Sequence, residues 1–295
     1  MATNGQGGEL YRTLTSDGGV AIRTLEATDL VAEAARRHQL GPLATQALGR
    51  VLIGAILLGA GGKHDETVQL RFNGNGPLGT LLAVADEHAR VRGYASRPLA
   101  DLPLRGGELD VAGGIGFGEL SVVRHRRGWR QPYTGIVPIV SGEVGEDLAL
   151  YLTESEQTPS AIGLGVALGP RGEVVAAGGF LAQALPGAAD ETLARLEANV
   201  AALSSPSRLC LQRGGAQAMV DVLVDGLGGQ ALTHQAAAFH CHCDEDRVIQ
   251  AVALLGRDEA EALSVAGEKV EVRCEFCAEL YRVDPDRVRA LFPDA

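Results

Sequence analysis

Residues 68–85 read Val-Gln-Leu-Arg-Phe-Asn-Gly-Asn-Gly-Pro-Leu-Gly-Thr-Leu-Leu-Ala-Val-Ala. The first part alternates apolar and polar residues as a half-buried strand does, with the apolar positions at Val68, Leu70 and Phe72. Two Asn-Gly pairs, at 73–74 and 75–76, are strong hairpin signals, and a second apolar run follows at 81–85. The stretch therefore predicts two antiparallel strands joined by a turn.

The same turn carries the glycine pattern of a dinucleotide site, since Gly74 to Gly79 match GxGxxG. In such a site a helix begins at the glycines, so that its N-terminus meets the pyrophosphate. Here Pro77 and the residues after it indicate a second strand instead. We therefore interpret these glycines as turn residues and not as a nucleotide site.

Patterns of both helical and strand period surround this hairpin. Helices are predicted over 29–39, 42–60 and 145–155, the first capped by Thr28 and the second a buried helix, too short and too interrupted for a membrane span. Residues 113–118 are rich in turn residues, and a short flexible start is expected before the first helix. Further strands are predicted at 91–94, 120–123, 135–140, 161–168 and 174–180. These elements predict an α+β domain with a mainly antiparallel sheet and packed helices.

Composition restricts the class of protein. The chain has 295 residues, 46% of them hydrophobic, which is enough for a sizeable core. Its net charge of -11 opposes broad binding to nucleic acid or to anionic membranes, so neither is expected as a partner. The first residues show no basic or apolar region of a secretory signal, and we expect a cytoplasmic protein. In that compartment five cysteines are more often free, metal-bound or redox-active than paired in structural disulfides.

The chain divides into three parts by sequence character. An N-terminal α+β domain is predicted over 1–187, where Leu-Pro-Gly breaks the pattern. Residues 188–238 contain short helical pieces separated by Ser/Pro-rich and Gly-rich interruptions. Short amphipathic helices gain little stability alone, so this part is predicted to be a metastable helical linker that depends on docking. Residues 239–295 form a small α+β module, which contains the paired cysteines.

Four of the five cysteines lie in this module as two close pairs separated by thirty residues, and they are Cys241, Cys243, Cys274 and Cys277. The first pair precedes a helix predicted over 245–255 and a short acidic helix over 258–263, and the second lies at the turn of a predicted hairpin. Asp284 and Pro285 are typical of the start of a final helix. Zinc prefers four sulfur ligands in a tetrahedron, so we predict one Zn²⁺ ion bound by these four cysteines.

Other chemically distinctive residues have plainer interpretations. His240 and His242 could serve as ligands instead, but four sulfurs already complete the shell. Cys210 lies between apolar neighbours and is predicted to be a buried, inert thiol. The basic cluster over 124–130 is interpreted as a solvated hairpin tip rather than a contact for anions or clients. The sequence contains no familiar catalytic motif, and no catalytic residue or enzymatic activity is predicted.

The cysteine pattern resembles that of one family, the bacterial 33 kDa chaperonins, which are redox-regulated heat-shock chaperones. Segments 74–79, 90–94, 133–135 and 178–187 resemble the family as well, and the likeness spans nearly the whole chain. The resemblance implies an ATP-independent holdase that is inactive while reduced and zinc-bound. It also implies that oxidation pairs Cys241 with Cys243 and Cys274 with Cys277 and releases zinc. The linker then unfolds, and the protein dimerises and holds unfolding client proteins, with 239–295 as the redox-switch domain.

The residues by themselves leave three disulfide pairings open. Neighbour pairing closes loops of three or four residues, and each such disulfide stabilises the fold by about 2 kcal/mol on the chain-entropy estimate. Neither disulfide would connect the two halves of the module. A structural zinc ion supplies about 10–16 kcal/mol of apparent binding free energy, so its loss would unfold the module. Cross-pairing would retain the link.

Two other functions remain open at the level of sequence. A constitutive structural zinc module for assembly would retain zinc under peroxide. A thiol oxidoreductase would use Cys274 and Cys277, but such pairs usually lie at a helix N-terminus, and strand-like flanks and acidic neighbours oppose this here.

Overall fold

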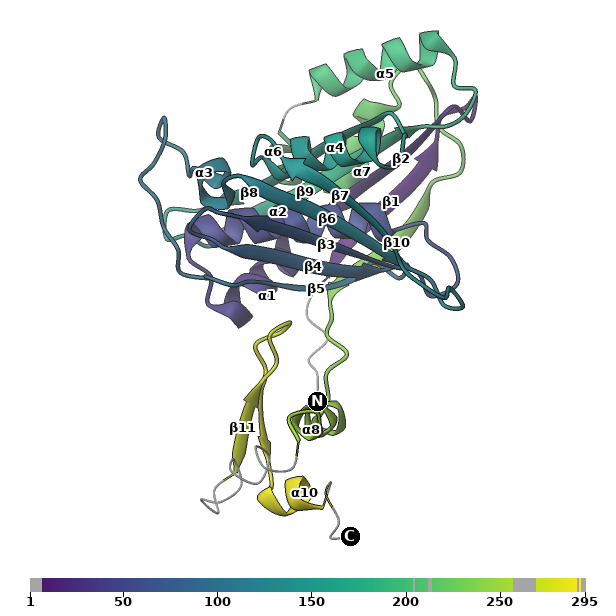
Figure 1. Ribbon diagram of the computed structural model, residues 1–295. Helices are drawn as coiled ribbons and strands as arrows, with labels where there is room; N and C mark the ends of the chain where they lie inside the picture. Colours follow the sequence, from purple (N-terminus) through teal and green to yellow (C-terminus); the bar gives the residue numbers. More distant parts are fainter. Residues whose placement is uncertain (1–6, 204, 212–213, 257–268, 291, 293–295) are drawn as a thin grey trace. The chain divides into compact units, whose positions relative to one another are not determined.

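The computed structural model describes residues 7–203, 205–211, 214–256, 269–290 and 292 (Figure 1). The chain folds as two compact units, Met1–Phe239 and His240–Ala295, which are described separately below.

The first unit is built on a sheet of ten strands, counted over the described residues, in the order β7-β6-β3-β4-β5-β10-β1-β2-β9-β8. All neighbouring strands are antiparallel except β5 and β10, which pair in parallel. The strands are β1 Gly8–Leu14, β2 Val20–Glu26, β3 Thr67–Gly74, β4 Thr80–Asp86, β5 Arg90–Ala95, β6 Gly118–His125, β7 Tyr133–Ile139, β8 Ser160–Leu168, β9 Val174–Ala184 and β10 Thr233–Phe239. The prediction of an α+β fold with a mainly antiparallel sheet is confirmed.

The hairpin predicted from residues 68–85 is the pair β3–β4. Val68 lies opposite Ala85 and Phe72 opposite Leu81, and the side chains of Val68, Leu70 and Phe72 are fully buried. Gly79 in the turn has φ 65, in the left-handed region that favours glycine. The backbone oxygen of Gly114 leaves no room for a Cβ atom at Gly76. The glycines therefore shape a turn, as predicted.

Four helices cover one face of the sheet, and their apolar residues form the main core with it. They are α1 Thr28–His38, α2 Pro42–Gly59, α3 Val111–Ile115 and α4 Val144–Glu154. The central helix α2 contacts both β3–β5 and β8–β9. It is the one helix in the described part of the chain that is long and apolar enough to cross a membrane, but 83% of it is buried inside the protein, as in a core helix.

The opposite face of β2 and β9 is covered by the helices of residues 190–223 (Figure 1). These are α5 Asp190–Ala202, α6 Pro206–Leu211 and α7 Gly215–Leu223. Because successive side chains of a strand point to opposite faces, Leu181 enters the main core while Phe180 and Ala182 pack under α5 and α7. Inside this interface the Thr24 hydroxyl donates a hydrogen bond of 2.8 Å to the carbonyl of Ala216.

Several elements differ from the sequence predictions. Residues 8–26, expected to include a flexible start, contain β1 and β2, which lie inside the sheet between β10 and β9. Residues 233–239, predicted to be helical, form β10, because the strand finds pairing partners in β1 and β5. The turn-rich stretch near 113 contains α3, and Thr28 lies inside α1 instead of capping it. Residues 190–239 belong to the first compact unit, and the metastability of 188–238 stays a prediction.

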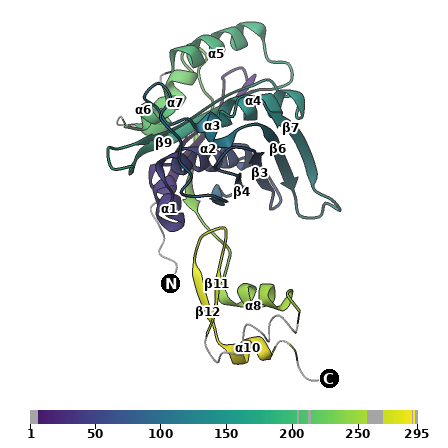
Figure 2. The same ribbon diagram turned by 60° about the vertical axis from the view of Figure 1, so that its left-hand side comes forward.

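The second unit contains α8 Glu245–Ala253, the hairpin of β11 Val270–Arg273 and β12 Leu280–Val283, and α10 Pro285–Arg289 (Figure 2). Among the described residues of this unit, one buried apolar cluster consists of Val248, Ile249, Val252, Val270, Val283 and Val288. Asp244 and Asp284 cap the two helices through their side chains, the second as predicted. The helix predicted over 245–255 ends at Ala253, Ile249 on it is buried, and Leu255 beyond it is exposed. The acidic helix predicted over 258–263 lies outside the described residues.

Candidate metal centre

Two segments of the second unit carry the four cysteines predicted to bind metal. Cys241 and Cys243 lie between β10 and α8, and Cys274 and Cys277 lie in the turn between β11 and β12. In that turn the Cys274 amide donates to the Glu279 carbonyl at 2.9 Å, and the Ala278 amide donates to the Cys274 carbonyl at 2.8 Å. These two bonds fix the backbone on both sides of the second cysteine pair.

All four Sγ atoms lie within 4.8 Å of one another. The Sγ atoms of Cys241 and Cys274 are 3.8 Å apart, and those of Cys243 and Cys277 are 3.2 Å apart. Four sulfurs bound tetrahedrally at zinc's usual distance would be about 3.8 Å from each other. The donor set therefore has the number, chemistry and spacing of a four-sulfur metal site and could hold one ion.

The proximity of these thiols changes their acidity. Hydrogen bonding to Cys274 raises the pKa of Cys241 to about 11. Hydrogen bonds with Cys241 and Cys274 raise the pKa of Cys277 as well, whereas hydrogen bonds from Cys241 and Cys277 lower the pKa of Cys274. Neighbouring thiols thus stabilise one thiolate by sharing their protons, because four adjacent negative charges would repel one another. A divalent cation would neutralise that repulsion and favour full deprotonation.

Tyr281 is a neighbour of the site that no sequence motif indicates. Its hydroxyl donates to the Sγ of Cys243 at 3.1 Å and also lies 3.2 Å from the carbonyl of Cys243. Burial, followed by the hydrogen bond with Cys243, raises the pKa of this phenol, so the hydroxyl stays a donor at neutral pH. The alternation of β12 was an available signal, because it places Tyr281 on the same face as the buried Val283.

The remaining candidates lie apart from the four sulfurs. The rings of His240 and His242 contact each other edge to face, with centroids 4.7 Å apart, and neither belongs to the cluster. Cys210 lies on α6 and packs beside Leu209, Ala216 and Met219. Burial raises its pKa to about 12, which keeps it a protonated and weakly nucleophilic thiol.

The basic cluster over 124–130 is only partly the solvated tip that the sequence predicted. The exposed tip carries Arg127, whereas the side chains of Arg124 and Arg126 turn inward to the buried carboxylate of Glu66. The reason is that Glu66, at the start of β3, would otherwise be buried without a positive partner.

Comparisons with known proteins match this chain over almost its whole length. The family model described as "Hsp33 protein" matches residues 8–284. The 33 kDa chaperonin of Symbiobacterium thermophilum is 43% identical over 281 residues, covering 95% of each chain, and that of Desulfotalea psychrophila is 42% identical over 272 residues, covering 92% of each. The crystal structure of the 33 kDa chaperonin of Thermotoga maritima superposes with a TM-score of 0.89 at 34% identity, covering 96% of this chain and 97% of that one.

Proposed function

The chain belongs to the Hsp33 family, and we propose that it is a redox-regulated holdase chaperone whose switch is the cluster of Cys241, Cys243, Cys274 and Cys277. The relatives named above are 33 kDa chaperonins, which supports a chaperone function and the binding of unfolded client proteins rather than an enzymatic activity. The observation that carries the redox part is the gathering of four thiols within 4.8 Å of one another, in a unit whose described residues form a small apolar cluster.

In the reduced state the four thiolates would hold one Zn²⁺ ion. The buried apolar cluster that the described part of this unit contains has six residues, and units of about 56 residues usually need an additional constraint. A structural zinc site contributes apparent binding free energy of about 10–16 kcal/mol, which in such units is folding free energy. The bound metal would join the segment of Cys241 to the hairpin of Cys274, and in this state the chaperone is inactive.

Oxidation would remove the ligands on which this arrangement depends. Two thiols and one molecule of hydrogen peroxide give one disulfide and two molecules of water, so two peroxides convert all four cysteines. We propose the pairs Cys241 with Cys243 and Cys274 with Cys277, on the family resemblance. Neither pair links the two segments, so the zinc is released and the unit loses its cross-link. Because the two short sulfur–sulfur distances given above are cross pairs, peptide mapping of the oxidised protein must decide the pairing.

Unfolding of the second unit is proposed to release residues 188–238. The apolar side chains of Val20, Ile22 and Phe180, which lie under α5 and α7, would then be exposed to clients and to a second copy of the chain. A homodimer that binds clients without ATP is the expected active form. We place this switch in the cytoplasm, where reducing conditions keep the cysteines free until oxidative stress. With a net charge of -11, neither nucleic acid nor anionic membrane is proposed as a partner.

The test follows zinc and chaperone activity in one sample. Zinc-loaded protein is exposed to peroxide at elevated temperature, while a chromogenic chelator records zinc and light scattering records the aggregation of an unfolding client. Zinc release and suppression of aggregation should rise together, and a thiol reductant should reverse both. The Cys210→Ser variant is the control, since Cys210 lies outside the cluster and should leave both time courses unchanged.

Three results would reject the proposal. Zinc that stays bound under peroxide would identify a constitutive structural module. Zinc release without suppression of aggregation would leave the cysteines without a chaperone role. Catalytic turnover of a disulfide substrate would indicate an oxidoreductase, although the turn position of Cys274 and Cys277 lacks the helix N-terminus that activates such thiols.

A further inference from the structure

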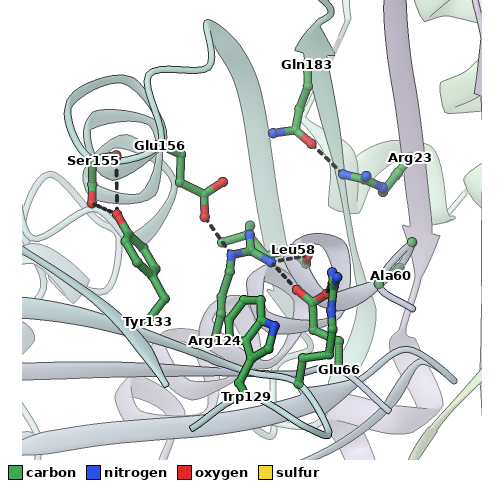
Figure 3. A pocket seen from close by; sticks show the side chains of 13 residues that line it. Arg23, Leu58, Ala60, Glu66, Arg124, Trp129, Tyr133, Ser155, Glu156 and Gln183 are labelled. Carbon is green, nitrogen blue, oxygen red and sulfur yellow. Dashed lines mark hydrogen bonds and ion pairs between the residues drawn. The ribbon is translucent and has the colours of Figure 1, made fainter. Parts of the chain in front are cut away.

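A cavity of about 520 Å³ lies in the first unit, far along the chain from the cysteines (Figure 3). Its walls come from β2, the segment after α2, the β6–β7 hairpin, the end of α4 and β9. Three of its lining residues are arginines, namely Arg23, Arg124 and Arg126, and two are glutamates, Glu66 and Glu156. The cavity thus combines a surplus of positive charge with the aromatic side chain of Trp129.

The two glutamates are already neutralised by two of the arginines. Arg124 donates to Glu156 at 2.7 Å and to Glu66 at 3.2 Å, and Arg126 donates to the second oxygen of Glu66 at 2.7 Å. Arg124 also reaches the carbonyl of Leu58 near the end of α2 at 3.4 Å, where the helix dipole is negative. These contacts form a closed network within the wall of the cavity.

Arg23 stands outside this network. Its Nη1 donates to the Oε1 of Gln183 at 2.6 Å, and within the described residues this neutral amide is its one acceptor. The guanidinium lies close to Gly61, where a Cβ atom would be 3.2 Å from Nη2. Burial, together with the positive charges of Arg124 and Arg12, lowers its pKa to about 10 against the opposing charge of Glu156. The guanidinium therefore remains charged at neutral pH, and no carboxylate among the described residues is hydrogen-bonded to it. Arg23 is half-buried, and partial burial of a cation is costly unless an anion pairs with it.

Arg126, another arginine of the lining, has one buried donor without a partner in the described part of the chain. The Nε of Arg126 is buried with no hydrogen-bond acceptor among the described residues. Its guanidinium lies over the ring of Trp129, 5.3 Å from the centroid, and Trp129 is 40% exposed. The cavity volume falls in the range of sites for small organic ligands and is far larger than a single ion needs.

We propose that this cavity binds a small organic anion, whose carboxylate or phosphate group pairs with Arg23 beside Gln183 and whose apolar part lies along Trp129. The fork of the Arg23 guanidinium suits the paired oxygens of either group. The site is independent of the cysteine switch, since all of its residues belong to the first unit and none is a cysteine. Failure of the chaperone proposal would therefore leave it intact.

The chain supplies its own reporter, because Trp129 is its single tryptophan. Reduced full-length protein is titrated with phenyl phosphate, benzoate and inorganic phosphate at constant ionic strength, and tryptophan emission and calorimetric heat are recorded. We expect a saturable emission change with at least one of the two aromatic anions and weaker binding of inorganic phosphate. Phenyl phosphate and benzoate together identify which anionic group the site prefers.

Three variants locate the binding. Arg23→Gln should weaken binding by about tenfold or more, because it removes the charged fork. Gln183→Glu should abolish binding while preserving or raising thermal stability, since it gives Arg23 an internal carboxylate. Arg130→Gln removes the same charge from the exposed hairpin tip, outside the cavity lining, and should leave affinity within about twofold.

Because Gln183→Glu should stay stable, a loss of anion binding in this variant would not be caused by misfolding. The proposal is overturned if none of the three anions gives a saturable signal. It is equally overturned if Arg130→Gln weakens binding as much as Arg23→Gln, because the anions would then sense only the general charge of the hairpin.

Discussion

Besides Cys274 and Cys277, Tyr281 of the β11–β12 hairpin contacts the first cysteine pair. Its hydroxyl donates to the sulfur of Cys243, and this is the kind of outer contact that orients a metal ligand and moderates its charge. Tyr281→Phe keeps the ring and removes the donor. We expect zinc affinity to fall by about 10- to 100-fold, measured by competition with a chelator of known affinity.

The matched control is Tyr11→Phe, which removes a phenol hydroxyl whose partner is the exposed Glu9 in the first unit. It should leave zinc affinity unchanged. Equal affinity in the parent and Tyr281→Phe would show that this hydrogen bond does not act on the metal site.

The ionised carboxylate of Glu66 is expected to stabilise the protein at neutral pH and to lose this effect in acid. Burial raises the pKa of this carboxyl, but the hydrogen bond from Arg126 and the charge of Arg124 outweigh burial, and the net pKa lies below 4.5. A carboxyl with a lowered pKa in the folded state contributes stability above its unfolded pKa and loses it as the pH falls through the folded pKa. Glu66→Gln should therefore lower the free energy of unfolding by about 2 kcal/mol at neutral pH and by progressively less below pH 4.5.

Urea denaturation of both proteins across this pH range measures the difference. Asp65→Asn is the control, because Asp65 pairs with Arg127 at the exposed hairpin tip and such pairs contribute little. A difference between the parent and Glu66→Gln that stays constant with pH would contradict the ionised pair.

At the scale of single elements, α7 offers a test of the proposed linker. Leu223 is fully buried on α7 against the β2–β9 face, so Leu223→Ala should weaken the docking of this segment by about 2–5 kcal/mol. We expect the variant to suppress client aggregation partly without oxidant, as measured by light scattering, while its zinc stays bound. Asp221→Ala, an exposed change on the same helix, should need oxidation as the parent does.

If Leu223→Ala loses stability but stays inactive until oxidised, the docking of α7 does not control client binding. Hydrogen exchange over residues 190–238 shows whether the substitution weakened the docking at all, and so distinguishes this outcome from an ineffective substitution.

Some elements of the fold could be predicted from the sequence and others could not. The hairpin β3–β4, the buried α2 and the second cysteine pair in a turn were predictable, because apolar period, Asn-Gly turns and cysteine spacing are local signals. The strand β10 was not, because its residues Ala236 to Ala238 favour a helix and become a strand only through pairing with β1 and β5.

Contacts distant in sequence account for the other omissions. Residues 8–26 form β1 and β2 in the middle of the sheet, where β9 and β10 stabilise them from the far end of the unit. Likewise, the cavity joins Arg23 of β2 to Gln183 of β9, a contact across 160 residues that no motif indicates. The four cysteines were found because few ligand sets suit zinc, whereas a lone arginine fits many roles.

For the whole molecule, the two compact units should differ in their dependence on metal. A strong zinc chelator should abolish the thermal transition of residues 240–295, whose core is small, and leave that of residues 1–239 in place. Differential scanning calorimetry, with hydrogen exchange to assign each transition, measures this. Re-addition of zinc should restore the thermal transition of residues 240–295. Chelation that left the protection of 240–295 unchanged would show that this unit folds without metal.

The position of β10 has a consequence for what the active protein would offer. In the described sheet, five strands lie on one side of β10 and four on the other, and β10 is the strand that pairs with both β1 and β5. If 188–238 unfolds to its end, most of β10 leaves with it, and α2 still contacts both parts. The sheet would then separate at this position, and β1 and β5 would become edge strands with unpaired backbone amides and carbonyls. A segment of an unfolding client would pair with these edges as an added β-strand, and backbone hydrogen bonds would hold it independently of its sequence.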